Sequence, residues 1–133
     1  MTHVALVRIS WPPRELFQND RSHHFAKAKA VRAYKHEAWG LALAQNVRRL
    51  NTKTPTLIFS FHPRTGPGRR PDLHNMPATM KAAIDGIADA MGCDDAGFRC
   101  IWPETWGEPT KGGCVLIEIM PPVVQVEVRR VIS

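Results

Sequence analysis

The feature that most constrains the fold is a long helical pattern between two short apolar runs. Residues 26–50 repeat apolar side chains at helical spacing, and one predicted face comprises Val31, Tyr34, Ala38 and Leu41. An adjoining predicted face comprises Trp39, Leu43, Val47 and Leu50. The flanking runs, residues 4–9 and 56–62, are rich in β-branched and aromatic residues, which favours strands. Gly40 weakens the predicted helix and would permit close packing or a kink.

A second helix is predicted after a loop at residues 63–71, which is rich in glycine, proline and arginine. Asn75 can cap this helix, Pro77 suits its first turn, and Gly92 is placed to end it. Its predicted core stripe comprises Met80, Ile84, Ile87 and Met91. The helix therefore has a predicted start, an end and a buried face.

Two further strands are predicted near the end of the chain. Residues 114–119 form an apolar run, and residues 124–128 alternate valines with polar side chains, as a half-buried strand does. The region between Asp95 and Gly113 is predicted to be a loop. The predicted fold class is α/β (α+β), with a mixed or antiparallel sheet of about four strands and two main helices packed on it. Residues 1–133 are the length of one ordinary domain, and no repeat or linker divides them.

The charge of the chain favours an acidic partner. Its 18 Lys and Arg residues exceed its 12 Asp and Glu residues, which gives a formal net charge of +6. Nucleic acid is the usual partner of such a protein. No apolar run approaches the roughly 20 residues of a membrane-spanning helix, and no signal-peptide pattern begins the chain. We therefore expect no membrane association and a cytoplasmic location. The three cysteines fit reduced thiols better than a disulfide framework or a zinc site.

The residues with the clearest chemical potential lie between Arg69 and Asp95. An Asp72-Leu-His-Asn cluster follows a basic loop, Lys81 lies on the next helix, and a turn ends in Asp94-Asp95. Carboxylates among arginines and lysines are typical of a divalent metal ion acting on a phosphodiester. Composition leaves a plainer alternative open, in which Asp72 forms an Asx turn and Asp94-Asp95 an ordinary surface turn.

This central stretch resembles the signature of the RusA family of Holliday junction resolvases, which are structure-specific endonucleases common in phages and prophages. The motifs that carry the resemblance are Asp72-Leu-His-Asn75, Lys81-Ala-Ala-Ile-Asp85-Gly86 and Gly92-Cys-Asp94-Asp95. The N-terminal part is also similar, with Pro12-Pro13 and Asn19-Asp20-Arg21 before a basic helix. The resemblance covers roughly residues 10–98 and is strongest in its centre.

The resemblance implies a metal-dependent endodeoxyribonuclease that resolves Holliday junctions or other branched DNA by phosphodiester hydrolysis, in recombination and repair. It makes Asp72 and Asp95 metal-binding and catalytic carboxylates, with Asp94 a neighbouring ligand candidate, and the metal Mg²⁺ or Mn²⁺. Lys81 would lie beside the scissile phosphate and stabilise its developing negative charge. Because a four-way junction is nearly two-fold symmetric, a C2 homodimer is implied as well.

Basic residues outside this cluster are expected to bind the DNA backbone, on the basis of their position and charge. On the loop before the acids these residues are Arg64, Arg69 and Arg70. On the first half of the long helix they are Lys27, Lys29, Arg32 and Lys35. For the helix, a solvated surface without a DNA role is the plainer alternative.

His74 departs from the family pattern, which has a second aspartate at this position. Imidazole is a poorer ligand for Mg²⁺ and a better one for Mn²⁺, so Mn²⁺ would be preferred if His74 is a ligand. The alternatives are an Asp94 or Asp85 ligand in its place, or an impaired nuclease that still binds junctions as a dimer. A small RNA-binding domain that uses the same charge without a metal is a third class of function.

Overall fold

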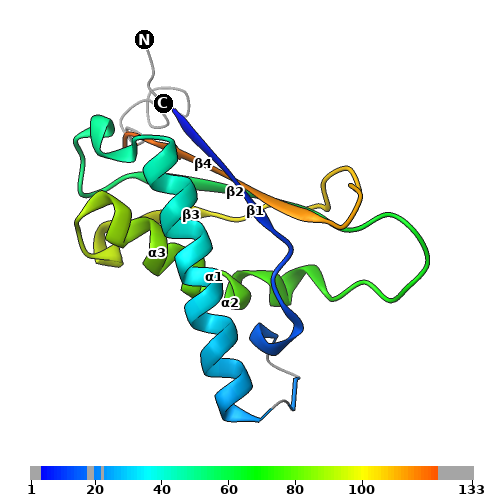
Figure 1. Ribbon diagram of the computed structural model, residues 1–133. Coiled ribbons are helices and arrows are strands. Elements are labelled where there is room, and N and C mark those ends of the chain that lie inside the picture. Colours follow the sequence, from blue (N-terminus) through cyan, green and yellow to red (C-terminus); the bar gives the residue numbers. More distant parts are fainter. Residues whose placement is uncertain (1–3, 18–19, 22, 123–133) are drawn as a thin grey trace.

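The centre of the molecule is a four-stranded mixed sheet (Figure 1). The computed structural model describes residues 4–17, 20–21 and 23–122. The strands are β1 (Ala5–Ser10), β2 (Thr56–His62), β3 (Arg99–Ile101) and β4 (Cys114–Met120). Their order is β1-β4-β2-β3, with β4 antiparallel to both neighbours and β2 parallel to β3. The mixed sheet confirms this part of the predicted fold class.

The helices lie on one side of this sheet (Figure 1). The α-helices are α1 (His24–Ala44), α2 (Met76–Thr79) and α3 (Lys81–Met91). Short 3-10 helices are η1 (Arg14–Leu16), η2 (Val47–Leu50), η3 (Leu73–Asn75) and η4 (Asp95–Gly97). The two main helices, α1 and α3, pack against each other, and α1 also contacts β1. The chain is thus a single α+β domain, as predicted.

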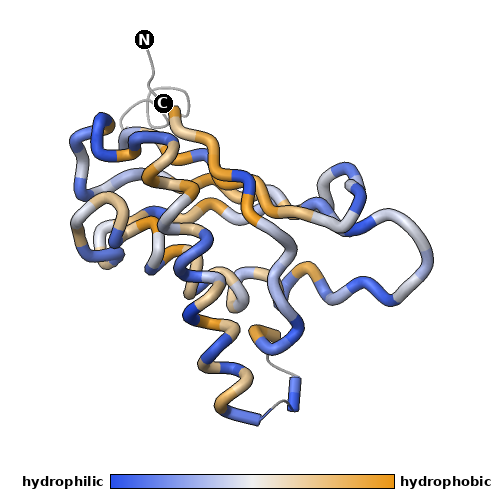
Figure 2. Tube along the Cα trace, viewed as in Figure 1, coloured by the Kyte–Doolittle hydropathy of each residue, from blue (hydrophilic) through white to orange (hydrophobic). Residues whose placement is uncertain are grey.

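The core forms between the helices and one face of the sheet. Alternate residues of β1 are buried and exposed, as a strand with one covered face requires. The inward side chains of the three longest strands are buried: Ala5, Val7, Ile9, Leu57, Phe59, Phe61, Val115, Ile117 and Ile119. Figure 2 shows the hydrophobic residues concentrated along these strands. The opposite face is more open, and Leu6 on it is 47% exposed.

The contact between α1 and α3 depends on Gly86. A Cβ atom at this position would overlap the backbone oxygen of Lys35 and lie 3.0 Å from the backbone nitrogen of Trp39. The two helices therefore approach closely because α3 has no side chain there. Gly40 was expected to permit close packing or a kink, but a Cβ atom there would meet nothing within 4 Å. Gly86, and not Gly40, therefore permits the close approach of the two helices.

Two details of the first predicted helix are wrong. The helix ends at Ala44, because Asn46 adopts a left-handed conformation with φ of 52°, and the chain continues as η2. Its buried stripe is also narrower than predicted and comprises Tyr34, Ala38 and Ala42. Val31, Trp39 and Leu43 are instead partly exposed on the helix surface. Tyr34 and Ala38 confirm part of the predicted face, whereas Ala42 is too small to have marked it by hydrophobicity.

The second predicted helix is divided. Its beginning folds as η3 and α2, and α3 starts after Met80. Asn75 makes no capping hydrogen bond through its side chain, contrary to expectation. Pro77 does lie in the first turn of α2, and Gly92 ends α3 with φ of 75°. The predicted stripe is confirmed, since Met80, Ile84 and Ile87 are buried and Met91 is partly buried against the core.

One strand was not predicted, and another prediction is outside the described residues. The region after Asp95 contains β3, whose three residues are too few to show alternation. Trp102 follows β3 and stacks on Phe59 with 4.3 Å between ring centroids, which fixes this strand to the core. The strand predicted at residues 124–128 lies outside the described residues.

The free edge of β1 is covered by side chains from α1 and the segment after it. Glu37 accepts hydrogen bonds from the backbone N–H and the hydroxyl of Ser10, at 2.8 and 2.7 Å. Gln45 accepts the N–H of Leu6 at 3.2 Å, and Arg49 donates to the carbonyl of Val4 at 3.1 Å. These bonds occupy backbone groups that an edge strand otherwise leaves open.

Tyr34 adds the most deeply buried of these edge bonds. Its side chain is 2% exposed, and its hydroxyl donates to the carbonyl of Ser10 at 2.7 Å. Burial, followed by the nearby Glu37, raises the pKa of Tyr34 above its ordinary value, so the hydroxyl keeps its proton.

We expect Tyr34→Phe to lower the free energy of unfolding by about 1 kcal/mol, because the ring still fills the core while the hydrogen bond is lost. Urea unfolding of both proteins measures this difference. An unchanged midpoint would show that the Ser10 carbonyl finds water as a replacement partner.

Candidate functional site

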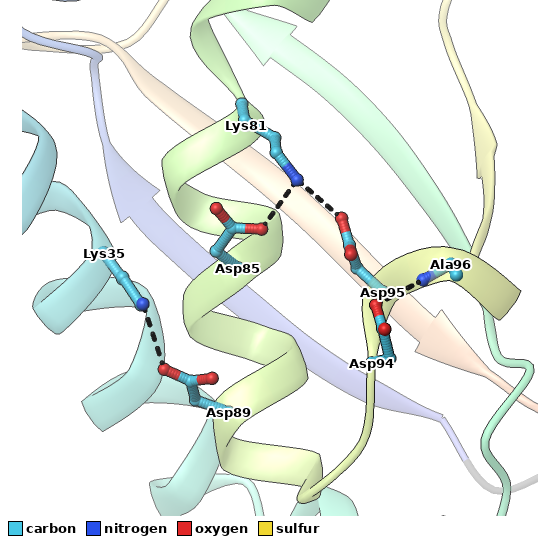
Figure 3. A network of polar contacts seen from close by, with 7 residues as sticks. All are labelled: Lys35, Lys81, Asp85, Asp89, Asp94, Asp95 and Ala96. Atoms are coloured by element: carbon cyan, nitrogen blue, oxygen red, sulfur yellow. Dashed lines mark hydrogen bonds and ion pairs between the residues drawn. The ribbon is translucent and has the colours of Figure 1, made fainter.

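Lys81 lies at the centre of the candidate site (Figure 3). Its Nζ atom is 2.9 Å from Oδ1 of Asp85 and 2.8 Å from Oδ2 of Asp95. Asp85 is one turn along α3 from Lys81, so the two side chains form an i, i+4 helical ion pair. Asp95 reaches the lysine because the chain reverses at Gly92 and η4 returns beside α3 (Figure 3). The fold therefore joins the helical part of the predicted motif, Lys81 and Asp85, to Asp95 at its C-terminal end.

The charges in this cluster stabilise one another. The pKa of Lys81 is raised, first by its hydrogen bond to Asp95 and then by that to Asp85. The pKa of Asp95 is lowered, chiefly because its carboxylate accepts the hydrogen bond from Lys81. Lys81 is nevertheless 67% exposed, so an anionic ligand can reach its ammonium group. The cluster holds the Lys81 ammonium in a fixed position between two carboxylates at an open surface.

Asp72 adopts the Asx turn that the plainer interpretation expects, and Asp94 makes the same kind of side-chain bond at its own turn. Oδ1 of Asp72 accepts the backbone N–H of His74 at 3.1 Å, at the start of η3. Oδ1 of Asp94 accepts the backbone N–H of Ala96 at 3.1 Å, at the start of η4. These bonds fix both backbones and use one oxygen of each carboxylate. The side chain of His74 is exposed.

The donor atoms of this region suit a hard divalent cation, which prefers carboxylate oxygen. Among residues 4–17, 20–21 and 23–122, no three His, Cys, Asp or Glu side chains form a group that could hold one ion. Magnesium commonly takes only one or two carboxylates, and water and substrate phosphate supply its other ligands. The donor chemistry of Asp72, Asp94 and Asp95 therefore fits such an ion, although the structure does not gather these residues with His74 into one group.

Three depressions adjoin one another beside these residues. We define the lysine pocket, of about 290 Å³, by Phe17, Lys27, Thr79, Lys81 and Asp85. The aromatic pocket, of about 450 Å³, is lined by Trp11, Phe17, Arg69, Arg70, Asp72 and Asn75. The arginine pocket, of about 340 Å³, includes Trp11, Arg64, Arg69 and Arg70. Phe17 is common to the first two pockets, and Trp11 to the last two, so they follow one another along the surface.

The three arginines of the predicted DNA-binding loop therefore gather around one pocket. The loop is attached to the segment before β4 by reciprocal backbone bonds, Thr65 to Thr110 at 3.0 Å and Thr110 to Pro63 at 2.9 Å. Figure 1 shows the two segments extending together beyond one end of the sheet. Arg70 lies 5.5 Å from the ring centroid of Trp106, a cation–π distance.

The basic residues of α1 differ in the contacts that they make with the rest of the protein. Lys27 donates to the carbonyl of Asp20 at 2.7 Å and lines the lysine pocket. Lys35 pairs with Asp89 of α3 at 3.3 Å (Figure 3), so its charge is partly neutralised within the protein. In the described part of the chain, Lys29 and Arg32 have no ion pair. Their role in DNA binding stays a prediction.

Sequence reasoning did not identify Trp11 and Phe17 as site residues. Trp11 directly precedes Pro12-Pro13, and Phe17 lies in a segment with no regular apolar period. Both side chains are half-buried beside the predicted acids and arginines. Their position depends on how η1 folds the chain back toward η3, for which the sequence offers no periodic signal.

Comparison with known proteins identifies a relative, but the name of that relative states no activity. No family model matches the chain. An uncharacterized protein of Xylella fastidiosa (strain Temecula1 / ATCC 700964) is 36% identical over 95 residues, which cover 69% of this chain and 61% of the relative. The chain thus spans about three fifths of the length of the curated relative it matches. None of the helices in the described part is both long and apolar enough to cross a membrane.

Proposed function

We propose that this protein is a metal-dependent, structure-specific endodeoxyribonuclease of the RusA type. Its substrate would be a Holliday junction or another branched DNA, and its reaction the hydrolysis of a phosphodiester bond in recombination and repair. The observation that carries the proposal is the exposed ammonium of Lys81, held between two carboxylates beside pockets lined by arginines. Such a surface combines a backbone-binding region with a fixed charge for a reacting phosphate.

Each part of the site has a role in this proposal. The arginine pocket binds the DNA backbone by charge and positions the duplex without reading its sequence. Asp95 and Asp85 orient the Lys81 ammonium, which stabilises negative charge on the phosphoryl oxygens. Asp72 and Asp95, with Asp94 or His74, would hold Mg²⁺ or Mn²⁺. A bound divalent cation would polarise the phosphoryl group and activate the attacking water.

The proposed protein acts as a homodimer in the compartment that holds the DNA, the cytoplasm in a bacterial cell. Two like-polarity strands of a junction must be cut, and a two-fold dimer presents one acidic site to each. The direct test is cleavage of a labelled synthetic four-way junction with Mg²⁺, Mn²⁺ or EDTA. We expect paired, symmetric nicks with either metal and none with EDTA, whereas a linear duplex of the same sequence should stay intact.

The variant His74→Asp distinguishes the nuclease from an impaired relative. If His74 is a ligand, the wild type should cleave faster with Mn²⁺, and His74→Asp should shift the preference toward Mg²⁺. Junction binding without cleavage, restored by His74→Asp, would instead identify an impaired junction-binding dimer. Preferred binding of single-stranded RNA over the junction, with no cleavage of either, would overturn the proposal in favour of an RNA-binding domain.

A further inference from the structure

The aromatic pocket has features that backbone binding does not require. Backbone phosphates are bound by charge alone, yet this pocket places two aromatic rings, Trp11 and Phe17, beside the arginines. Its volume of about 450 Å³ lies within the about 300–1,000 Å³ that small-molecule sites occupy. Asp72 forms part of its lining, so the pocket opens directly beside a candidate metal ligand.

The tryptophan of this pocket is held firmly by its neighbours. The Trp11 and Trp106 rings are 6.1 Å apart and tilted by 35°, and both pack against the hydrophobic core. A Cβ atom at Gly113 would lie 3.2 Å from the Trp11 ring, so the backbone before β4 also approaches it closely. An aromatic side chain that is already fixed in the free protein loses little conformational entropy when a ligand stacks on it.

The polar groups of the pocket suit a nucleotide better than an apolar ligand. The guanidinium groups of Arg69 and Arg70 supply positive charge at its margin. The side-chain amide of Asn75, within the described residues, makes no hydrogen bond to the protein, and it can donate and accept at the edge of a base. Aromatic faces that stack on a base, with cations for the adjoining phosphate, are the usual means of binding unpaired nucleotides.

We propose that the aromatic pocket binds an unpaired nucleobase of the branched substrate, next to the phosphate that is cut. This inference rests on the proposed nuclease function and names the part of the substrate that the site selects. Phe17 lies between this pocket and the lysine pocket. A base held here would therefore place its neighbouring phosphate toward Lys81. A base pair at the branch point opens more readily than one within intact duplex, which gives a physical reason for preferring branched DNA.

The test measures junction binding in EDTA, so that it does not depend on cleavage. Four-way junctions carry a single abasic residue at each position near the branch in turn, and dissociation constants are compared for wild type and Phe17→Ala. If one base occupies the pocket, removing that base should weaken wild-type binding about tenfold, within the about 1–3 kcal/mol of one base-stacking contact. The same abasic site should have little further effect on Phe17→Ala, because the contact is already absent.

Two further variants separate recognition from folding. Phe17→Trp keeps an aromatic face and should restore the dependence on the base. Phe25→Ala removes a phenylalanine that is 71% exposed on α1 and lines none of the three pockets, so it should bind as wild type does. Equal loss of affinity for wild type and Phe17→Ala at every abasic position would overturn the base pocket. In that case, nicking in the cleavage assay would still support the proposed nuclease. Base-dependent binding that requires Phe17, without any nicking, would refute the proposed nuclease and leave the base pocket supported.

Discussion

Lys81→Ala is expected to lower the rate of junction nicking by about two to three orders of magnitude, the usual effect of removing one group that stabilises transition-state charge. The ammonium is the exposed cation that the fold holds between Asp85 and Asp95. Lys81→Arg keeps the charge but not its compact geometry, and it should recover only part of the rate. Single-turnover cleavage at saturating protein separates this loss from weaker binding.

A loss of activity without a loss of stability would identify a catalytic role. Exposed ion pairs contribute little to folding, so Lys81→Ala should unfold at nearly the wild-type urea concentration.

Asp72→Asn should reduce cleavage at least as strongly as Lys81→Ala does, because it removes the charge of a proposed metal ligand. Asp89→Asn is the matched control for this change. Asp89 lies on α3, as Lys81 does, but it pairs with Lys35 at 3.3 Å instead of with Lys81. If Asp89→Asn impaired nicking as much as Asp72→Asn, a specific role for the predicted acids would be refuted.

Gly86→Ala is expected to destabilise the protein by about 2 kcal/mol, the effect of overpacking a close contact. The new methyl group would meet the Lys35 carbonyl and the Trp39 amide, which are backbone atoms and have no alternative rotamer. The helices α1 and α3 would have to separate, although alanine itself favours a helix more than glycine does. Because α3 carries Lys81 and Asp85, cleavage should also fall.

Gly40→Ala provides the opposite result within the same pair of helices. No atom lies within 4 Å of the added methyl group, so only the helix preference remains. We expect a gain of about 0.5–1 kcal/mol in the free energy of unfolding. Urea denaturation of both variants tests the comparison. A loss of stability at Gly40, or no loss at Gly86, would contradict the described packing of α1 on α3.

The sequence predicted the elements with regular periods and missed those that depend on contacts between distant segments. Residues 56–62 are rich enough in β-branched and aromatic side chains to be placed as a strand with the observed bounds. By contrast, β3 has three residues and is held by parallel pairing with β2, which no local pattern records. The buried stripe of α1 was predicted in part, since Tyr34 and Ala38 were placed on it, but Ala42 was missed.

The candidate site was predicted in its residue types better than in its geometry. Lys81 does join Asp85 and Asp95, a contact that required the turn at Gly92. The approach of Trp11 and Phe17 could not be predicted, because it depends on how the segment after β1 folds over η3. Whether Asp72 and His74 act with Asp95 on one metal ion stays a prediction. Their carboxylate and imidazole groups are at the surface, where a substrate phosphate can supply further ligands.

The coverage of β1 determines how a second copy of the chain can join the first. Another strand could pair with β1 only by displacing the side chains of Tyr34, Glu37 and Gln45, so a continuous eight-stranded sheet across two subunits is disfavoured. The opposite edge, β3, offers three residues for such pairing. Among the described residues, the surfaces left for the proposed dimer contact are therefore those of the helices and the open face of the sheet. The same side chains hinder edge-to-edge association of folded chains through β1.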